Sequence, residues 1–290
     1  MKKEEVQVSF SAGRNCPKTD IPAGACDCHH HIYDPLRFPY QPTDVRNQPP
    51  STVESYRLLQ KRLGTSRNVI IQPSAYGTDN ACTLDALRQM GKENTRAVVV
   101  VDGSITDREL QEMHELGVRG LRFNINCGGS DNLEEIRRLA ERIAPMGWSI
   151  CFWMSPDLAV SLEDFLRSLP CEIIFDHRGH IPAKAGINHP AVEAICRMLR
   201  DHKAWVKLSG LYIDTACEDY ADTIAVGKTY VAAEPERVIW GTDWPHPSCY
   251  SGLKPVPNDA DLLDALMVQA GSKENFHKIL VENPEKLFGF

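Results

Sequence analysis

The sequence predicts a single (β/α)8 barrel, because short apolar segments alternate with helix-like segments along most of its 290 residues. The apolar segments are rich in β-branched residues, as strands buried on both faces should be, and their alternation with helices predicts a parallel sheet. Eight such units fill about 265 residues, close to the roughly 250 residues of a closed barrel. The predicted strands begin near residues 24, 68, 97, 118, 148, 172, 204 and 237.

The other elements follow from turn and capping signals. Residues 1–20 are polar and lack periodicity, so we expect a flexible N-terminal arm, followed by one barrel domain over residues 21–290. The segment "SPDLAVSLEDFLRSL" predicts a helix that begins at Ser155 and Pro156, and "NLEEIRRLAERIA" has apolar residues near a 3.6-residue period. The final segment, "NFHKILVENPEKLFGF", predicts a helix that ends near Pro284 and a last turn that packs back on the barrel.

Composition limits the classes of partner. The formal net charge of −7 argues against nucleic acid as the main partner. No apolar segment follows "MKKEE", and no run approaches the roughly 18 apolar residues that span a membrane, so we expect a cytoplasmic protein. The ten cysteines are scattered and several lie in strand-like runs, which predicts buried, reduced thiols. The sequence leaves a monomer and a small homo-oligomer open.

Three consecutive histidines end the first predicted strand. Catalytic residues of such barrels lie at the C-terminal ends of the strands. Because side chains alternate along a strand, His29 and His31 should face the barrel mouth and His30 should point away. A pair of inward imidazoles suits either a divalent metal or a pair of hydrogen-bond donors. The plain alternative is three surface histidines at the start of a loop.

A further histidine and a carboxylate follow the sixth and eighth strands. His177 lies in "FDHRGH" and Asp243 in "GTDWPHP". Because the eighth strand neighbours the first in a closed barrel, Asp243 should face His29 and His31. The alternatives are a structural histidine at position 177 and a helix cap at position 243.

Other strand ends carry candidates for substrate binding. Arg122 ends the fourth strand, which suggests recognition of an anion or carbonyl, or else an ion pair with a loop acid. Trp153, at the end of the fifth strand, should form an apolar wall. Lys207, in the seventh strand, is either buried in the site or paired with a carboxylate.

Polar groups for orienting a ligand follow the second and fourth strands. The segment "QPSAYGTDN" offers Ser74 and Tyr76, and Asn124 lies two residues beyond Arg122. We expect all three side chains to form hydrogen bonds with a polar ligand.

Together these segments resemble the amidohydrolase superfamily, and within it the 2-pyrone-4,6-dicarboxylate lactonase family, which includes galactarolactone isomerases and sulfomuconolactone hydrolases. The resemblance covers residues 24–288 and rests on "DCHHHIYDP", "RNVIIQPSAYGTDNACTLDAL", "GVRGLRFNI", "IIFDHRGH", "WVKLSG" and "RVIWGTDWPHP". It implies a distorted (β/α)8 barrel, the functional residues His29, His31, His177 and Asp243, and an activity that needs no divalent metal.

The strand ends also bear on metal binding. Metal-dependent relatives usually supply a Lys or Glu from strand four and a His from strand five, where this sequence has Arg122 and Trp153. A two-metal centre is therefore not expected, because two ligands are missing and a fixed positive charge is nearby. A single Zn²⁺ held by His29, His31, His177 and Asp243 stays chemically open.

The resemblance, with its departures, predicts the reaction class. The dicarboxylate lactonase carries further arginines where this sequence reads "NINCGGSDN" and "GLYIDTAC", so we expect an anionic lactone with fewer carboxylates, or with a sulfonate. We predict that water activated by Asp243 hydrolyses this lactone, in aromatic-compound or sugar-acid catabolism, while histidines stabilise the oxyanion. The alternatives are a lactone isomerase, a metal-dependent decarboxylase or hydrolase, and a barrel that only binds a metabolite.

Overall fold

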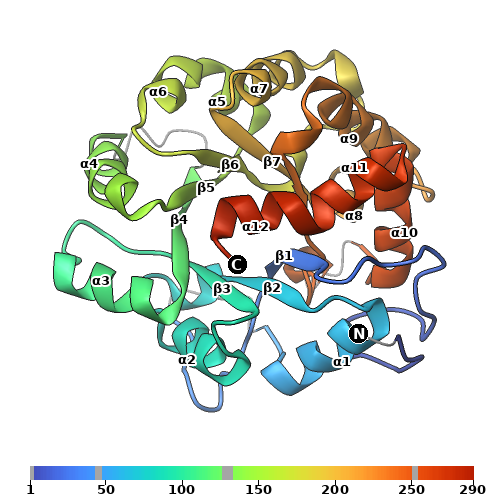
Figure 1. Ribbon diagram of the computed structural model, residues 1–290, viewed down its shortest axis with the longest axis horizontal. Helices are drawn as coiled ribbons and strands as arrows, with labels where there is room; N and C mark the ends of the chain where they lie inside the picture. The colour runs from blue at the N-terminus through green and yellow to red at the C-terminus, as the bar shows by residue number, and fades with distance from the viewer. Residues whose placement is uncertain (1–2, 43–47, 126–132, 250–253) are drawn as a thin grey trace.

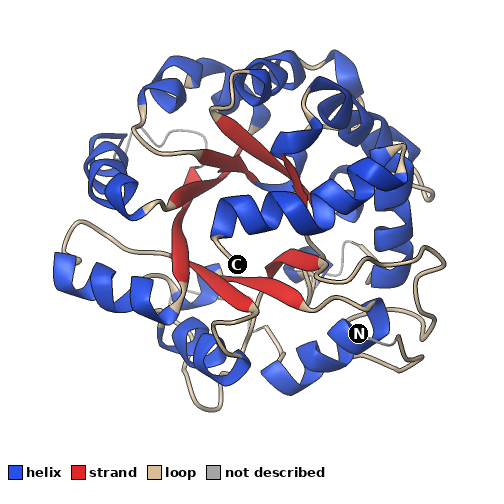
Figure 2. Ribbon diagram, viewed as in Figure 1, coloured by secondary structure: helices blue, strands red, loops and turns tan. Residues whose placement is uncertain are grey.

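The computed structural model describes residues 3–42, 48–125, 133–249 and 254–290. Within them, eight parallel strands follow one another in chain order around a single sheet, and helices surround it (Figures 1 and 2). This confirms the predicted (β/α)8 barrel, and each predicted strand is present. The strands are β1 Cys26–His30, β2 Arg67–Ile71, β3 Thr95–Val99, β4 Val118–Ile125, β5 Ser149–Met154, β6 Ile173–Phe175, β7 Ala204–Leu208 and β8 Val238–Trp240.

Most of the twelve α-helices in the described residues pack on the outer face of the strand ring, which explains the apolar stripe along segments such as α4. The twelve are α1 Val53–Leu63, α2 Ala81–Met90, α3 Asp107–Leu116, α4 Leu133–Ile143, α5 Pro156–Ser161, α6 Glu163–Ser168, α7 Pro190–Arg200, α8 Leu211–Asp214, α9 Ala221–Ala233, α10 Asp259–Ala270, α11 Lys273–His277 and α12 Asn283–Phe288. Among the described residues, no helix is long and apolar enough to cross a membrane.

The segment after β8 closes the ring against β1. Asp243 N donates to His29 O and His31 N donates to Trp244 O, each at 2.8 Å. Gly241 lies so close to β1 that a Cβ added to it would be 2.5 Å from the His29 Cβ atom. A glycine is therefore needed where β8 meets β1.

A buried carboxylate fastens the same seam. Asp27 Oδ1 accepts from Thr242 N at 2.9 Å, and its Oδ2 accepts from the Thr242 hydroxyl at 2.7 Å and from the Tyr56 hydroxyl at 2.9 Å. Burial raises the pKa of Asp27 to about 6, although these hydrogen bonds act in the opposite direction. Asp27 therefore joins β1, α1 and the chain that follows β8.

A β-bulge in β1 sets the direction of the histidines. Four residues of β1, from Asp27 to His30, span three residues of β2, from Asn68 to Ile70. Cys28 packs inside the barrel with Val69 and Ile71, and simple alternation from Cys28 would turn His29 outward. The bulge shifts the phase, so that His29 also faces inward.

The C-terminal helix closes the end of the barrel where the strands begin. Figure 1 shows α12 lying across this end, where Phe288 O accepts from Arg96 Nε near the start of β3 at 3.1 Å. Leu287 and Phe288 join the interior cluster, as predicted. The helical run continues past Pro284 after a π-helical turn, Lys278–Glu282, and the prediction that it ends near Pro284 was wrong. Proline is tolerated there because it lies in the first turn of α12.

The N-terminal segment lies along the outside of the barrel. Val8 is buried, Ser9 O accepts from Trp244 Nε1 at 2.8 Å, and Thr19 N donates to Asp264 of α10 at 2.8 Å. The division of the chain at residue 20 stays a prediction. Nine cysteines lie in the described residues and all are free thiols, and seven of them are buried; Cys127 lies outside those residues.

Candidate active site

Three histidines surround one carboxylate at the C-terminal end of the barrel. The Nε2 atoms of His29 and His31 each lie 3.5 Å from Asp243 Oδ1, and His177 Nε2 lies 3.9 Å from the same oxygen. All four side chains are at least 96% buried, with 0–4% of each exposed. The structure thus brings together the four residues to which the sequence assigns catalytic roles.

His30 lies outside this cluster, as alternation predicted. Its ring stacks on Tyr56 of α1, with a centroid distance of 3.5 Å. Its Nε2 atom lies 3.0 Å from Asn68 Oδ1. Burial lowers the pKa of His30 to about 3, so this imidazole is a neutral packing group.

The backbone holds the carboxylate and one imidazole in unusual conformations. Asp243 has φ +65° and His177 has φ +47°, both in the left-handed region that side chains other than glycine rarely adopt. Asp243 Oδ2 also accepts a hydrogen bond from the Tyr212 hydroxyl of α8 at 2.5 Å. Such strained positions cluster at functional sites, where the surrounding structure maintains them.

The charges of the cluster follow from burial and proximity. Burial alone would raise the pKa of Asp243, but the surrounding histidines, His177 foremost, hold it well below its usual range. Burial lowers the pKa of His177 to about 4 and, together with Lys207, holds the pKa of His29 well below 6.5. Near neutral pH the site therefore contains an ionised Asp243 beside neutral His29 and His177.

A second ionic layer lies beneath the imidazoles. Asp176, which directly follows β6, is fully buried, and its carboxylate contacts Lys207 Nζ at 2.9 Å and Arg122 Nε at 3.2 Å. Lys207 Nζ also lies 3.1 Å from His29 Nδ1. Both interpretations of Lys207 therefore hold together: it is buried in the site and paired with a carboxylate. Asp176 holds the pKa of Lys207 above its ordinary value despite burial.

The predicted ligand-orienting residues are spread more widely. Asn124 Nδ2 donates to Ser74 Oγ at 3.0 Å, and both side chains are exposed to solvent. The Tyr76 hydroxyl is buried and accepts from Asp34 N at 2.9 Å, so it serves the loop after β1. Trp153 is half-buried, and the edge of its ring meets His180 at a centroid distance of 4.9 Å.

Three residues near the cluster carried no role in the sequence analysis. They are Asp176, Tyr212 and His180. His180 packs against His177 with a centroid distance of 5.1 Å, and its Nε2 atom is buried without a hydrogen-bond partner. Asp176 and His180 lie in the same "DHRGH" run as His177, which was the available signal. The "CGGSD" part of the predicted substrate segment falls in residues 126–132, outside the described residues.

The cluster has the composition of a small metal site. One ligand atom each from His29, His177 and Asp243 lie within 4.8 Å of one another. With metal–ligand bonds of about 2.0–2.2 Å, this spacing could accommodate a zinc ion. Lys207 and Arg122 place two positive charges close to this position, which opposes a divalent cation.

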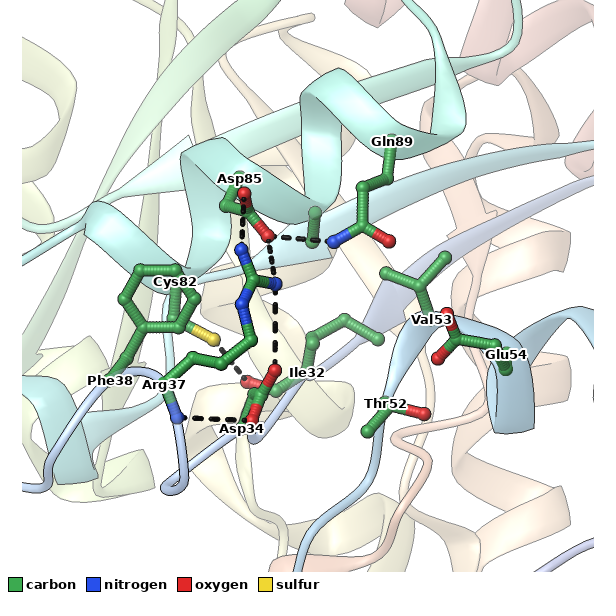
Figure 3. Close-up of a pocket in the computed structure, with 11 residues that line it drawn as sticks. Ile32, Asp34, Arg37, Phe38, Thr52, Val53, Glu54, Cys82, Asp85 and Gln89 are labelled. Atoms are coloured by element: carbon green, nitrogen blue, oxygen red, sulfur yellow. Dashed lines mark hydrogen bonds and ion pairs between the residues drawn. The ribbon is translucent and has the colours of Figure 1, made fainter.

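A separate pocket lies beside the loop that follows β1, between α1 and α2 (Figure 3). Arg37 crosses it and forms two hydrogen bonds with the Asp85 carboxylate, at 2.7 and 3.0 Å. None of the site histidines lines this pocket. Its charged groups pair with each other, so we assign it no part in the chemistry.

Comparison with known proteins places this geometry in a family. The amidohydrolase family model matches residues 26–290. The chain is 34% identical to a 4-sulfomuconolactone hydrolase from Hydrogenophaga intermedia, over 93% of this chain and 90% of the relative. It is 33% identical to a 2-pyrone-4,6-dicarboxylate hydrolase from Comamonas testosteroni, over 97% and 95% of the two chains.

A sugar-acid enzyme and a solved structure extend the comparison. The chain is 30% identical to a D-galactarolactone isomerase from Agrobacterium fabrum, over 94% of this chain and 93% of the relative. An apo crystal structure from Agrobacterium tumefaciens superposes with a TM-score of 0.82 at 30% identity, covering 95% of this chain and 99% of the other. The family match spans the barrel and all four residues of the buried His–Asp cluster, so the chain belongs to the amidohydrolase family.

Proposed function

We propose that the protein hydrolyses a small anionic lactone. The observation that carries this proposal is the position of the buried Asp243 carboxylate, whose Oδ1 atom lies 3.5–3.9 Å from three imidazole Nε2 atoms at the barrel mouth. A carboxylate that can take a proton, beside groups that can polarise a carbonyl, suits attack of water on an ester. Relatives that are at least 30% identical include two lactone hydrolases and a lactone isomerase.

In the proposed reaction, Asp243 Oδ1 removes a proton from water as the water oxygen attacks the lactone carbonyl. The carbonyl π electrons move to the oxygen, and a tetrahedral oxyanion forms. As the intermediate collapses, the bond between the acyl carbon and the ring oxygen breaks, and the leaving oxygen takes the proton from Asp243. The product is the open-chain hydroxy acid, or its keto tautomer where the leaving oxygen is enolic. The Tyr212 hydroxyl holds the other carboxylate oxygen and aims Oδ1 at the water.

The hydrogen-bond donors that polarise the lactone carbonyl would be His29, His177 and Arg122. Arg122 donates from Nε to Asp176 and from Nη1 to Gln72 O. Within the described residues this leaves Nη2 to donate to a substrate oxygen. His31 Nδ1 lies 2.8 Å from Ile71 O and must donate to it. A neutral His31 therefore presents a lone pair at Nε2, and it donates to an oxyanion there only as an imidazolium.

The substrate would be a compact anion bound against a wall of polar and aromatic side chains. His180, with its buried and unpartnered Nε2, and Trp153 form one side of this wall, and Ser74 with Asn124 form another. Tyr76 would orient the lactone ring only indirectly, because its hydroxyl bonds to the loop that follows β1. The buried free thiols support a cytoplasmic location, and we propose a monomer or small homo-oligomer.

We further propose that this chemistry needs no metal. Lys207 and Arg122 already place positive charge beside the cluster, and a divalent ion would be repelled by it. The two cations can themselves stabilise the negative charge of the oxyanion. The rival proposal is a metal-dependent hydrolase or decarboxylase that uses the His29, His177 and Asp243 cluster.

The reaction is tested by a screen of sulfomuconolactones, 2-pyrones and aldarolactones in ¹⁸O-labelled water. Hydrolysis predicts one labelled oxygen in the product carboxylate for each ring opened. An isomerase, in which a substrate hydroxyl replaces water as the nucleophile, predicts conversion without label. The absence of turnover on all three classes would contradict the proposal.

We expect a pH profile without an inflection at 6.5, the ordinary pKa of histidine. The pKa of His177 is lowered to about 4, so this ring stays neutral until the pH falls toward that value. The pKa of Asp243 is lower still, so the base stays ionised over the same range. The kcat/KM value should therefore stay level from neutral pH to about one unit above the His177 pKa and fall below it. A drop centred near 6.5 would contradict the lowered pKa of His177.

A further inference from the structure

Lys207 contacts the Nδ1 edge of the His29 ring, whereas the Nε2 edge of the ring faces Asp243. Its ammonium lies 2.9 Å from Asp176 Oδ1 and 3.1 Å from His29 Nδ1, and it is fully buried. An ammonium has three donors and no lone pair, so the ring nitrogen that faces it must be the acceptor. Because a neutral imidazole carries one proton, that proton then lies on His29 Nε2.

The contacts at the Nε2 edge of His29 independently place the ring proton on Nε2. His31 Nδ1 faces the Ile71 carbonyl oxygen at 2.8 Å and must carry a proton, which leaves a lone pair on the Nε2 atom of neutral His31. His29 Nε2 lies 3.3 Å from His31 Nε2, the atom that carries this lone pair. A proton on His29 Nε2 makes this contact a hydrogen bond, whereas two facing lone pairs would repel.

Among the described residues, one contact competes with the assignment of the proton to His29 Nε2. His29 Nδ1 lies 3.4 Å from Asp176 Oδ1, so a proton on Nδ1 could point toward that oxygen. Lys207 Nζ is closer to both atoms, and it already donates to the same carboxylate oxygen. Removal of the lysine amine would leave Asp176 as the nearest partner for His29 Nδ1.

We propose that Lys207 is a positioning residue that holds His29 with its proton on Nε2. His29 then has a donor for the reacting carbonyl, once that oxygen replaces His31 Nε2 as its acceptor, and has no lone pair for a metal ion. A histidine that binds a metal normally donates its other ring N–H to a carboxylate or carbonyl. His31 has such a partner in Ile71 O, whereas His29 has a cation in that place. This inference rests on the proposed metal-free function and supplies its structural cause.

The test compares two variants that each remove one cation from Asp176. Lys207→Met removes the contact with His29, whereas Arg122→Met leaves that contact intact. Histidine-selective ¹⁵N labelling reports the proton on each ring nitrogen through long-range ¹H–¹⁵N NMR, with His29 assigned from its loss in His29→Asn. Zn²⁺ affinity of chelator-treated protein is measured by calorimetry.

We expect the wild-type spectrum to show a protonated Nε2 and an unprotonated Nδ1 in His29. Lys207→Met should move the proton to Nδ1 and strengthen Zn²⁺ binding by at least about tenfold, the lower range of effects for partners of metal-ligating histidines. Arg122→Met should keep the wild-type tautomer.

Two results would overturn the proposal. One is an Nδ1–H tautomer in the wild-type protein, which needs no variant to detect. The other is the same tautomer and the same Zn²⁺ affinity in Lys207→Met and Arg122→Met, which would reduce Lys207 to a counterion of Asp176. Neither measurement uses a lactone, so an incorrect reaction class would appear in the substrate screen and leave these results interpretable.

Discussion

Asp243→Asn should lower kcat/KM for lactone opening by roughly 10²–10⁴-fold, because the amide cannot take the proton of the attacking water. Asn has nearly the same shape, so it can keep a hydrogen bond with the Tyr212 hydroxyl and leave the backbone seam between β8 and β1 unchanged. Binding of the lactone should therefore persist while turnover is lost. Steady-state kinetics and calorimetric titration with the substrate separate these two effects.

Two further variants make this prediction specific. Asp107→Asn changes a largely exposed carboxylate that pairs with Arg142 on the outer ring of helices, and it should leave turnover unchanged. Tyr212→Phe keeps the base but removes its partner, so it should lower kcat less than Asp243→Asn does. Full turnover by Asp243→Asn would remove Asp243 from the mechanism.

Asp176→Asn should destabilise the fold by about 3–5 kcal/mol, since it leaves the cations of Lys207 and Arg122 buried without their shared counterion. The expected readout is a lower urea midpoint together with a lower melting temperature. Adding Lys207→Met should restore part of the loss, because it removes one uncompensated charge.

The matched control is Asp214→Asn, which removes a carboxylate that lies 3.4 Å from Arg178 and is partly exposed. Because the buried Arg178 guanidinium keeps its hydrogen bonds to the carbonyl oxygens of Ser209 and Gly210, the loss of stability should be clearly smaller. Equal losses in Asp176→Asn and Asp214→Asn, or no restoration in the double variant, would show that Asp176 is not the anion that balances the buried cations.

Much of this arrangement could be predicted from the sequence, because strand order and strand ends follow from local patterns. Parallel strands in a barrel bring their C-terminal ends to one rim, so His29, His31, His177 and Asp243 could be placed together without a structure. The eight strands were likewise recognisable as short β-branched runs. The helix past Pro284 was missed because proline usually ends a helix, and only the π-helical turn shows how the chain continues.

The remaining features depend on details that sequence patterns do not encode. The bulge in β1 lets both Cys28 and His29 face inward, and it is visible only in the register with β2. The left-handed backbone at Asp243 and His177 depends on tertiary contacts, since few residues other than glycine adopt that region without support. The sequence allows Lys207 to be a site residue or an ion-pair partner, and only the folded arrangement shows that one ammonium contacts both Asp176 and His29.

The most direct test of metal-free lactone hydrolysis is a rate measured on protein whose metal content is determined in the same sample. After chelator treatment and desalting, elemental analysis gives the metal per chain, and the initial rate of ring opening is recorded with and without added Zn²⁺. The arrangement of Asp243, His29 and Lys207 predicts an unchanged rate at far less than one metal per chain, and no gain on adding Zn²⁺. A rate that falls in proportion to the metal removed, and returns when Zn²⁺ is added, would contradict it.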